Sequence, residues 1–232
     1  MDGGVIALLL ALAAPVQAER APDWREVATR DDRRRLRRWR DAWEEALDAA
    51  REDGAGAEIA ADPALYDPDT ALPGAPPPPG EYRCRTVKLG SQGPGLPYVA
   101  YPFFTCRIET DGRFVKVTGS QRPVGRIYPA SEGRAVFLGT LALGDERGAL
   151  RYGRDRMRDM AGRVERIGER RWRMVFPYPH YESVLDLIEL LPAQGRVATT
   201  GAGMGSVATT GGGTTAGRGV TGGAGSGGSD AR

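Results

Sequence analysis

The chain has 232 residues, and its 32 lysines and arginines against 30 acidic residues leave a formal net charge of only +2. Arginine supplies nearly all of the positive charge and is interleaved with Asp and Glu, so the sequence lacks the clustered basic footprint of a nucleic-acid-binding protein. The length indicates one domain, or one domain with tails.

The first eighteen residues predict export. An apolar run from Val5 to Ala14 is followed by Pro15 and by Val16-Gln17-Ala18, which offers small residues where a signal peptidase cuts. The run is too short to cross a bilayer, which takes about 20 residues, and the alternative is a buried apolar helix. We therefore expect a signal peptide over residues 1–18, cleavage near Ala18, and a mature protein in the periplasm or outside the cell. We expect no transmembrane segment in the mature chain, because no later segment is apolar over about 18 residues.

A helix is expected from Arg30 to Asp53. Thr29 suits the N-cap position and Gly54 suits the end of the helix. Apolar residues recur at spacings of three and four, which places them on one face. They are Leu36, Trp39, Trp43, Ala46, Leu47 and Ala50.

The arginines of this helix lie mostly on its other faces. They are Arg33, Arg34, Arg35, Arg37, Arg38 and Arg40. An anionic partner such as a membrane surface could bind them. Acidic residues stand at helical distance from most of them, however, so we favour a solvated face with ion pairs inside the helix.

Three further segments complete the predicted organisation. A short helical turn is expected between Glu58 and Leu65, and the Pro-rich stretch Asp67–Gly80 predicts an extended connector. Residues 19–80 thus form an N-terminal helix and connector, and residues 81–192 a β-rich domain. Residues 193–232 are rich in Gly, Thr and Ser with few apolar residues to bury, which predicts a disordered tail.

Alternation of apolar and polar residues predicts strands from Glu81 onward. Eight segments qualify: Tyr82–Leu89, Phe103–Glu109, Arg113–Gly119, Val124–Tyr128, Arg134–Leu143, Met160–Ile167, Arg171–Phe176 and Val184–Leu191. The last of them fits a short helix nearly as well. Short turns between the strands favour a mostly antiparallel sandwich or barrel, and eight strands can close a barrel without exposed edges. The predicted fold class is α+β, with the N-terminal amphipathic helix packed against the barrel or sandwich.

Cys84 and Cys106 are the two cysteines of the chain. They lie in the first two predicted strands, which a short connection makes neighbours. In an exporting compartment two cysteines suffice for one bridge, so we expect a disulfide between them rather than two free core thiols.

The segment from Asp23 to Pro192 resembles the DUF4893 family, an uncharacterised group of exported proteins of alphaproteobacteria. The resemblance rests on Asp23–Arg25, Leu36–Trp43, Gly80–Arg85, Thr118–Gly125, Phe137–Thr140, Tyr152–Arg156, Asp159–Gly162 and Arg171–Arg173. It implies export and no particular activity, and it does not include the Gly-rich tail.

Two polar connections are candidate ligand-binding segments. Ser120, Gln121 and Arg122 offer a hydroxyl, an amide and a guanidinium between two strands, where a carboxylate or phosphate could bind. The alternative is a structural turn in which Arg122 satisfies carbonyl groups. The second segment, residues 145–159, contributes Tyr152, Arg154 and Asp155.

Acidic residues in the segment 145–159 also raise the possibility of paired catalytic carboxylates. Each acid has an Arg nearby in sequence, which favours a structural ion network with lowered carboxyl pKa values.

Catalytic and metal chemistry lack partners in this sequence. His180 is the single histidine, and we expect it to be a surface residue of a Pro-rich turn. It has no serine in a nucleophile-elbow context, and no second histidine for a metal, so we expect no catalytic residue, metal or cofactor. The leading hypothesis is a non-enzymatic module that binds an unknown small ligand or a periplasmic protein. The alternatives are a protease-inhibitor-like barrel and a hydrolase that uses residues 145–159.

Overall fold

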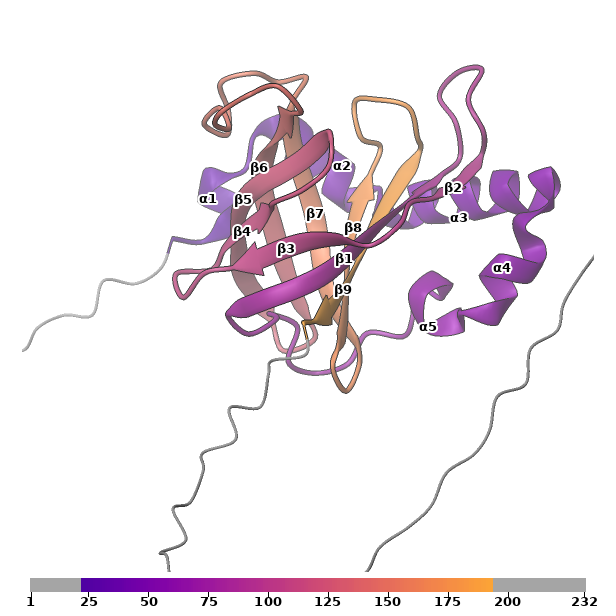
Figure 1. The fold of residues 1–232 in the computed structure, drawn as a ribbon, viewed down its shortest axis with the longest axis horizontal. Helices are drawn as coiled ribbons and strands as arrows, with labels where there is room; N and C mark the ends of the chain where they lie inside the picture. The colour runs from indigo at the N-terminus through magenta and orange to yellow at the C-terminus, as the bar shows by residue number, and fades with distance from the viewer. Residues whose placement is uncertain (1–21, 194–232) are drawn as a thin grey trace, which may run out of the picture. The chain divides into compact units, whose positions relative to one another are not determined.

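A computed structural model describes residues 22–193 of the chain (Figure 1). The predicted signal peptide and the Gly-rich segment from residue 194 onward lie outside the described residues. The described chain forms a closed antiparallel β-barrel with short helices packed against it, which confirms the predicted fold class and selects the barrel over the sandwich.

The barrel is built from strands that follow one another in chain order. Eight of them form the ring: β1 Gly80–Leu89, β3 Phe104–Ile108, β4 Arg113–Lys116, β5 Gln121–Ser131, β6 Arg134–Leu143, β7 Asp159–Gly168, β8 Arg171–Pro177 and β9 Leu185–Pro192. Pairing of β1 with β9, from Tyr82↔Pro192 to Leu89↔Leu185, closes the ring. All eight strands predicted from the sequence are present.

Two strand assignments are settled by the packing. The ambiguous segment at residues 184–191 is strand β9. Its apolar pairs arise because Leu185 and Leu187 pack under the helices while Ile188 and Leu190 fill the barrel. The sequence did not predict β2, Tyr98–Ala100, which pairs with the end of β1 outside the ring. Three residues are too few to show alternation.

The predicted single helix from Arg30 to Asp53 is wrong in its continuity. The chain forms α1 Trp24–Val27, α2 Arg30–Arg37, α3 Trp39–Ala50, a π-helical turn Arg51–Ala55, α4 Gly56–Ala61 and α5 Pro63–Tyr66. The helix breaks at Arg38, whose φ and ψ are −93° and 21°. The break lets Leu36 pack over β6 and β7 while α3 crosses β1, β8 and β9, so one straight helix could not cover both surfaces.

The barrel interior is filled with aromatic and aliphatic side chains over much of its length. Phe137 makes edge-to-face contacts with Phe114 and Phe176, at centroid distances of 5.8 and 5.6 Å. The predicted disulfide between Cys84 and Cys106 is present in this core and joins β1 to β3, with Cα atoms 5.8 Å apart.

A buried ionic cluster links the helices to the outer wall of the barrel. The Glu165 carboxylate accepts hydrogen bonds from Nε of Arg163 and Nε of Arg173, at 2.9 and 3.0 Å. Arg173 also donates to the carbonyl groups of Leu65 and Asp67, which ends the helical segment against the sheet. The Trp39 ring covers Arg163 at 3.6 Å. The cluster satisfies these charges by geometry rather than by contact with water.

Candidate functional site

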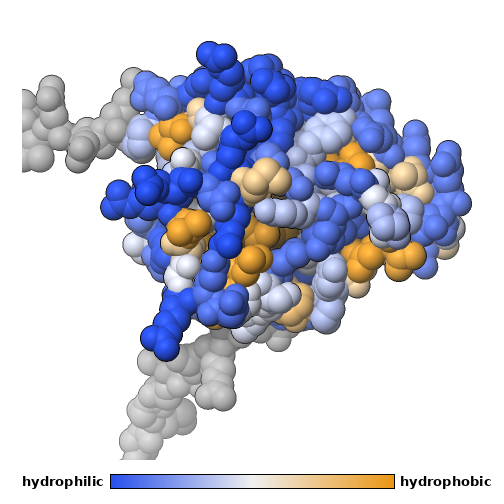
Figure 2. Space-filling view, turned by 90° about the horizontal axis from the view of Figure 1, so that it is seen from above, coloured by the Kyte–Doolittle hydropathy of each residue, from blue (hydrophilic) through white to orange (hydrophobic). Residues whose placement is uncertain are grey.

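One end of the barrel is open and hollowed. The β1–β2, β6–β7 and β8–β9 connections surround this end (Figure 1), and Figure 2 shows it from above as hydrophobic surface framed by hydrophilic side chains. The hollow, which we call the barrel mouth, has a volume of about 860 Å³ with its open part included. Its apolar lining consists of Phe104, Pro123, Leu141, Met160, Phe176 and Ile188.

The alternation of the strands explains why charged side chains reach the mouth. On β1, Tyr82 and Cys84 belong to the barrel core, so the same inward-facing row continues to Thr86 and Lys88. On β4 the row runs from Phe114 to Lys116. The row of β9 ends in the same way, with Asp186 beyond the core residues. The mouth is therefore the polar continuation of the hydrophobic core.

Lys88 and Asp186 form a buried ion pair in the mouth. They are direct partners in the β1–β9 register, with Nζ and Oδ2 3.5 Å apart, and Lys88 also pairs with Glu182 at 3.0 Å. Burial alone lowers the pKa of Lys88, but Asp186 and Glu182 outweigh it and raise that pKa. Burial raises the pKa of Asp186, although Lys88 and the hydroxyl of Ser183 oppose this. Lys88 is thus held as an ammonium by its own counter-charges.

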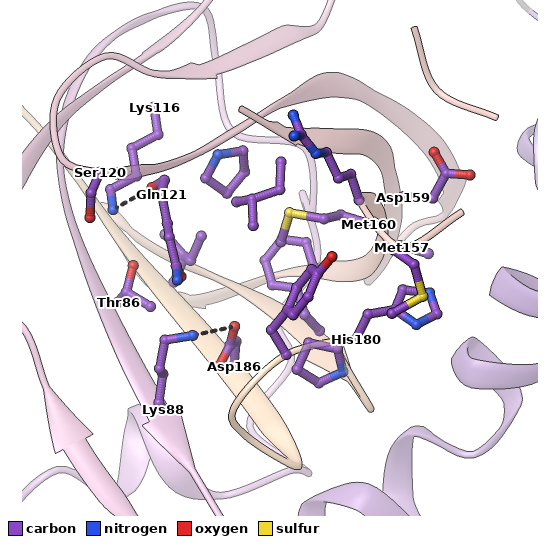
Figure 3. A pocket seen from close by; sticks show the side chains of 18 of the residues that line it. Thr86, Lys88, Lys116, Ser120, Gln121, Met157, Asp159, Met160, His180 and Asp186 are labelled. Carbon is purple, nitrogen blue, oxygen red and sulfur yellow. Dashed lines mark hydrogen bonds and ion pairs between the residues drawn. The ribbon is translucent and has the colours of Figure 1, made fainter. Parts of the chain in front are cut away.

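Lys116 is held differently (Figure 3). Its side chain is 5 % exposed, its Nζ donates to the Gln121 carbonyl oxygen at 3.0 Å, and it lies 4.2 Å from the centroid of the Phe104 ring. No carboxylate among residues 22–193 forms an ion pair with it. Burial lowers the pKa of the Lys116 amine to about 8, and the charge of Lys88 adds to the effect. The mouth therefore contains one buried amine without a counter-charge.

These two residues are the only lysines of the chain. The 32 basic residues are 30 arginines and Lys88 and Lys116. Neither lysine was among the residues predicted from the sequence to bind a ligand. The signal that could have found them is their rarity combined with their inward-facing strand positions.

The β8–β9 connection forms one wall of the mouth. Gln92 donates to the carbonyl oxygens of Pro179 and Ser183, both at 2.6 Å, and Glu182 accepts from the Gln121 amide at 3.1 Å. His180 lies in this turn, as predicted, but the expectation of a surface residue is wrong. Its imidazole is half-buried because the turn folds back over the barrel end, and its Nε2 has no hydrogen-bond partner among the described residues. Burial, then Arg35, lowers the pKa of His180.

The acids of the β6–β7 connection are largely engaged with arginine. Arg158 pairs with Glu146 and, at 3.5 Å, with Asp155. The bond from Arg158 lowers the pKa of Glu146. Asp159 differs, because it lines the mouth and accepts from the Gly153 amide at 2.9 Å, and burial raises its pKa.

Comparison with protein families adds an identity to this geometry. A family model described as a domain of unknown function (DUF4893) matches residues 24–190. The chain belongs to the DUF4893 family. Comparisons with curated proteins and with solved structures gave no match. The resemblance drawn from the sequence is confirmed, and the function of this DUF4893 domain has to be argued from its own side chains.

The structure of the DUF4893 domain brings together two of the six predicted ligand residues. Ser120 and Gln121 line the mouth. Arg122 instead donates to the carbonyl groups of the turns around it, including Leu143 at 2.7 Å and Glu146 at 2.9 Å. Arg122 thus holds the β6–β7 connection in place, in the manner of the structural alternative.

The other three predicted residues of the DUF4893 domain lie outside the lining of the mouth. The Tyr152 hydroxyl accepts from the Thr29 amide at 3.0 Å and donates to Asp32, so it anchors α2. Arg154 is exposed, and Asp155 accepts from the Met157 amide at 3.0 Å.

Two further kinds of site were sought in residues 22–193. No group of three His, Cys, Asp or Glu side chains in this range is arranged to hold a metal ion. None of its helices combines the length and the apolar character needed to cross a membrane.

Proposed function

We propose that the barrel mouth binds a small organic acid with an apolar body. The observation that carries the proposal is the buried Lys116 ammonium, which faces a cavity and has no protein carboxylate beside it. Burying an unpaired charge costs a folded protein several kcal/mol. The carboxylate of a ligand would supply the missing counter-charge.

The remaining lining supports an apolar body with few polar groups. Six apolar residues form most of the surface below Lys116, and Thr86, Ser120 and Gln121 offer uncharged hydrogen-bonding groups near it. A mostly apolar concave site with a few placed polar groups is typical of small-molecule binding. Lys88 adds no net attraction for an acid, because Asp186 and Glu182 already neutralise it.

The two rival functions find less support in the contacts. A hydrolase using residues 145–159 needs free carboxylates, whereas Glu146 and Asp155 both pair with Arg158. An inhibitor of the kind considered needs a protruding N-terminal segment. In this chain Ala28 and Leu36 pack against Val136, Leu138 and Ala161 of the barrel wall.

We further propose that the protein works in an oxidising compartment, the periplasm or the cell exterior. The support is the disulfide between its two cysteines, since such bonds are rare in a reducing cytoplasm. Expression of the full chain in a bacterium that exports proteins should yield a periplasmic product beginning at Glu19. A cytoplasmic product that retains Met1 would contradict this part of the proposal.

Calorimetric titration tests the acid-binding proposal. Straight-chain carboxylic acids of about four to ten carbons should bind, and the matching alcohols should bind at least about tenfold more weakly, because they lack the charge that Lys116 attracts. Lys116→Met should abolish the preference for acids. Arg113→Met, on the exposed end of the same strand, is the matched control and should leave binding unchanged. Equal binding of acids and alcohols, or acid binding that survives Lys116→Met, would refute the proposal.

A further inference from the structure

The choice of lysine at two positions is the starting observation, and the inference rests on the proposed function. Arginine supplies every other basic side chain, including Arg163 and Arg173, which are buried in the cluster under α3. Charge and burial alone therefore do not explain lysine in this chain. A lysine differs from an arginine in that it can lose its proton and then act as a nucleophile toward a carbonyl carbon.

The two lysines are in different states. Lys88 is held by Glu182 at 3.0 Å and by Asp186 at 3.5 Å, which keep it protonated. Lys116 has no such partner, and its pKa of about 8 leaves roughly a tenth of it as the neutral amine at pH 7. Figure 3 shows both side chains reaching into the same mouth, where Lys116 lies beside Ser120 and Gln121.

The proposed ligand chemistry places a carbonyl group at this amine. In a 2-oxo acid the carbonyl carbon is bonded directly to the carboxylate carbon. The group that Lys116 attracts would therefore bring the carbonyl carbon next to Nζ. The apolar residues below would hold the side chain of the oxo acid and keep water away from the reacting atoms.

We infer that Lys116 forms a reversible imine with a 2-oxo acid that has an apolar side chain. The neutral Nζ attacks the carbonyl carbon and gives a carbinolamine. The carbonyl oxygen then leaves as water, and a C=N bond replaces the C=O bond. Overall, the ammonium and the ketone give a protonated imine and one water molecule. Nitrogen loses two protons to that water, so charge and atoms balance without an oxidant or reductant. The protonated imine remains paired with the adjacent carboxylate of the ligand.

Reductive trapping tests the inference, and the chain suits it because only two lysines and the N-terminal amine can react. The folded protein is incubated with 4-methyl-2-oxopentanoate and cyanoborohydride, which reduces an imine to a stable secondary amine, and peptides are mapped by mass spectrometry. Labelling of Lys116 should exceed that of Lys88 by at least about tenfold, as expected from their different fractions of neutral amine. In urea the preference should disappear.

Lys116→Arg separates the inference from the proposed function. The variant keeps the positive charge, so calorimetry should still detect 4-methylpentanoate, which has the same apolar body and no ketone. It should show no adduct at position 116 with the oxo acid. A wild-type protein that binds 4-methylpentanoate but carries no adduct, or carries it mainly on Lys88, would refute the imine and leave the acid site standing. Failure to bind 4-methylpentanoate together with preferential labelling of Lys116 would refute acid recognition and support the reactive amine. Absence of both would refute both.

Discussion

Replacing Lys116 with Met should stabilise the protein at neutral pH. The pKa of this amine falls from 10.5 to about 8 on folding, so keeping it charged in the folded state costs roughly 3 kcal/mol. Met has a similar unbranched shape and no charge to bury. The substitution also removes the hydrogen bond to the Gln121 carbonyl, worth about 1 kcal/mol. We expect a net increase of about 2 kcal/mol in the free energy of unfolding at pH 7.

The pH dependence gives this prediction its sign. Between pH 8 and 10.5 the unfolded chain binds a proton at Lys116 that the folded chain has lost, so wild-type stability gains from rising pH in that window. Below about pH 8 the cost is fully present. The advantage of Lys116→Met should therefore be largest at pH 7 and should shrink toward pH 10.5.

Urea unfolding followed by Trp fluorescence at pH 7 and pH 10.5 measures both effects, with Arg113→Met as the control for loss of a positive charge on the same strand. The reasoning is refuted if Lys116→Met is less stable than the wild type at pH 7. It is equally refuted if its advantage is the same at both pH values.

Three further predictions concern what holds the barrel together. Glu165→Gln should lower the free energy of unfolding in urea by about 3–5 kcal/mol, because it leaves Arg163 and Arg173 buried without their counter-charge; a loss below about 1 kcal/mol would show that the cluster is not buried as described. Gly139→Ala should lower the melting temperature, since its Cβ would lie 2.4 Å from the Val124 carbonyl oxygen, and an overpacked site costs about 1–3 kcal/mol; an unchanged melting temperature would contradict the close approach of β5 and β6. Thiol titration of the denatured, unreduced protein should find no free thiol, and replacing both cysteines by Ser should cost roughly 3 kcal/mol in urea unfolding; two reactive thiols would contradict the bridge.

The strands could be predicted from the sequence because each buries at least one face. Trp172, Met174 and Phe176 alternate with their neighbours, and this pattern alone locates β8. The strand β2 lacks such a pattern. The break at Arg38 was also out of reach, because helical periodicity records which face is apolar and not whether the chain bends to follow two different surfaces.

The candidate site was only partly predictable for a related reason. Ser120 and Gln121 could be found because polar residues in a short connection between strands lie at a sheet end. Lys88 and Lys116 were overlooked because a lysine in an alternating strand is usually assigned to the solvent side. Their spacing from Cys84 and Phe114 does place them on the inward row, however, so the sequence contained the signal. That Lys88 has counter-charges and Lys116 has none depends on the closure of β9 against β1, which only the fold reveals.

The most direct test of the account is an NMR titration of the two lysine side chains. Protein labelled with ¹³C at lysine Cε gives two signals, which Lys116→Met assigns. The account predicts that Lys116 titrates near pH 8 in the free protein and at a higher pH with 4-methylpentanoate bound, while Lys88 titrates above 10.5 in both states. A Lys116 signal that titrates near 10.5 and does not respond to the acid would contradict the central claim that this amine is a buried acceptor site for a ligand carboxylate.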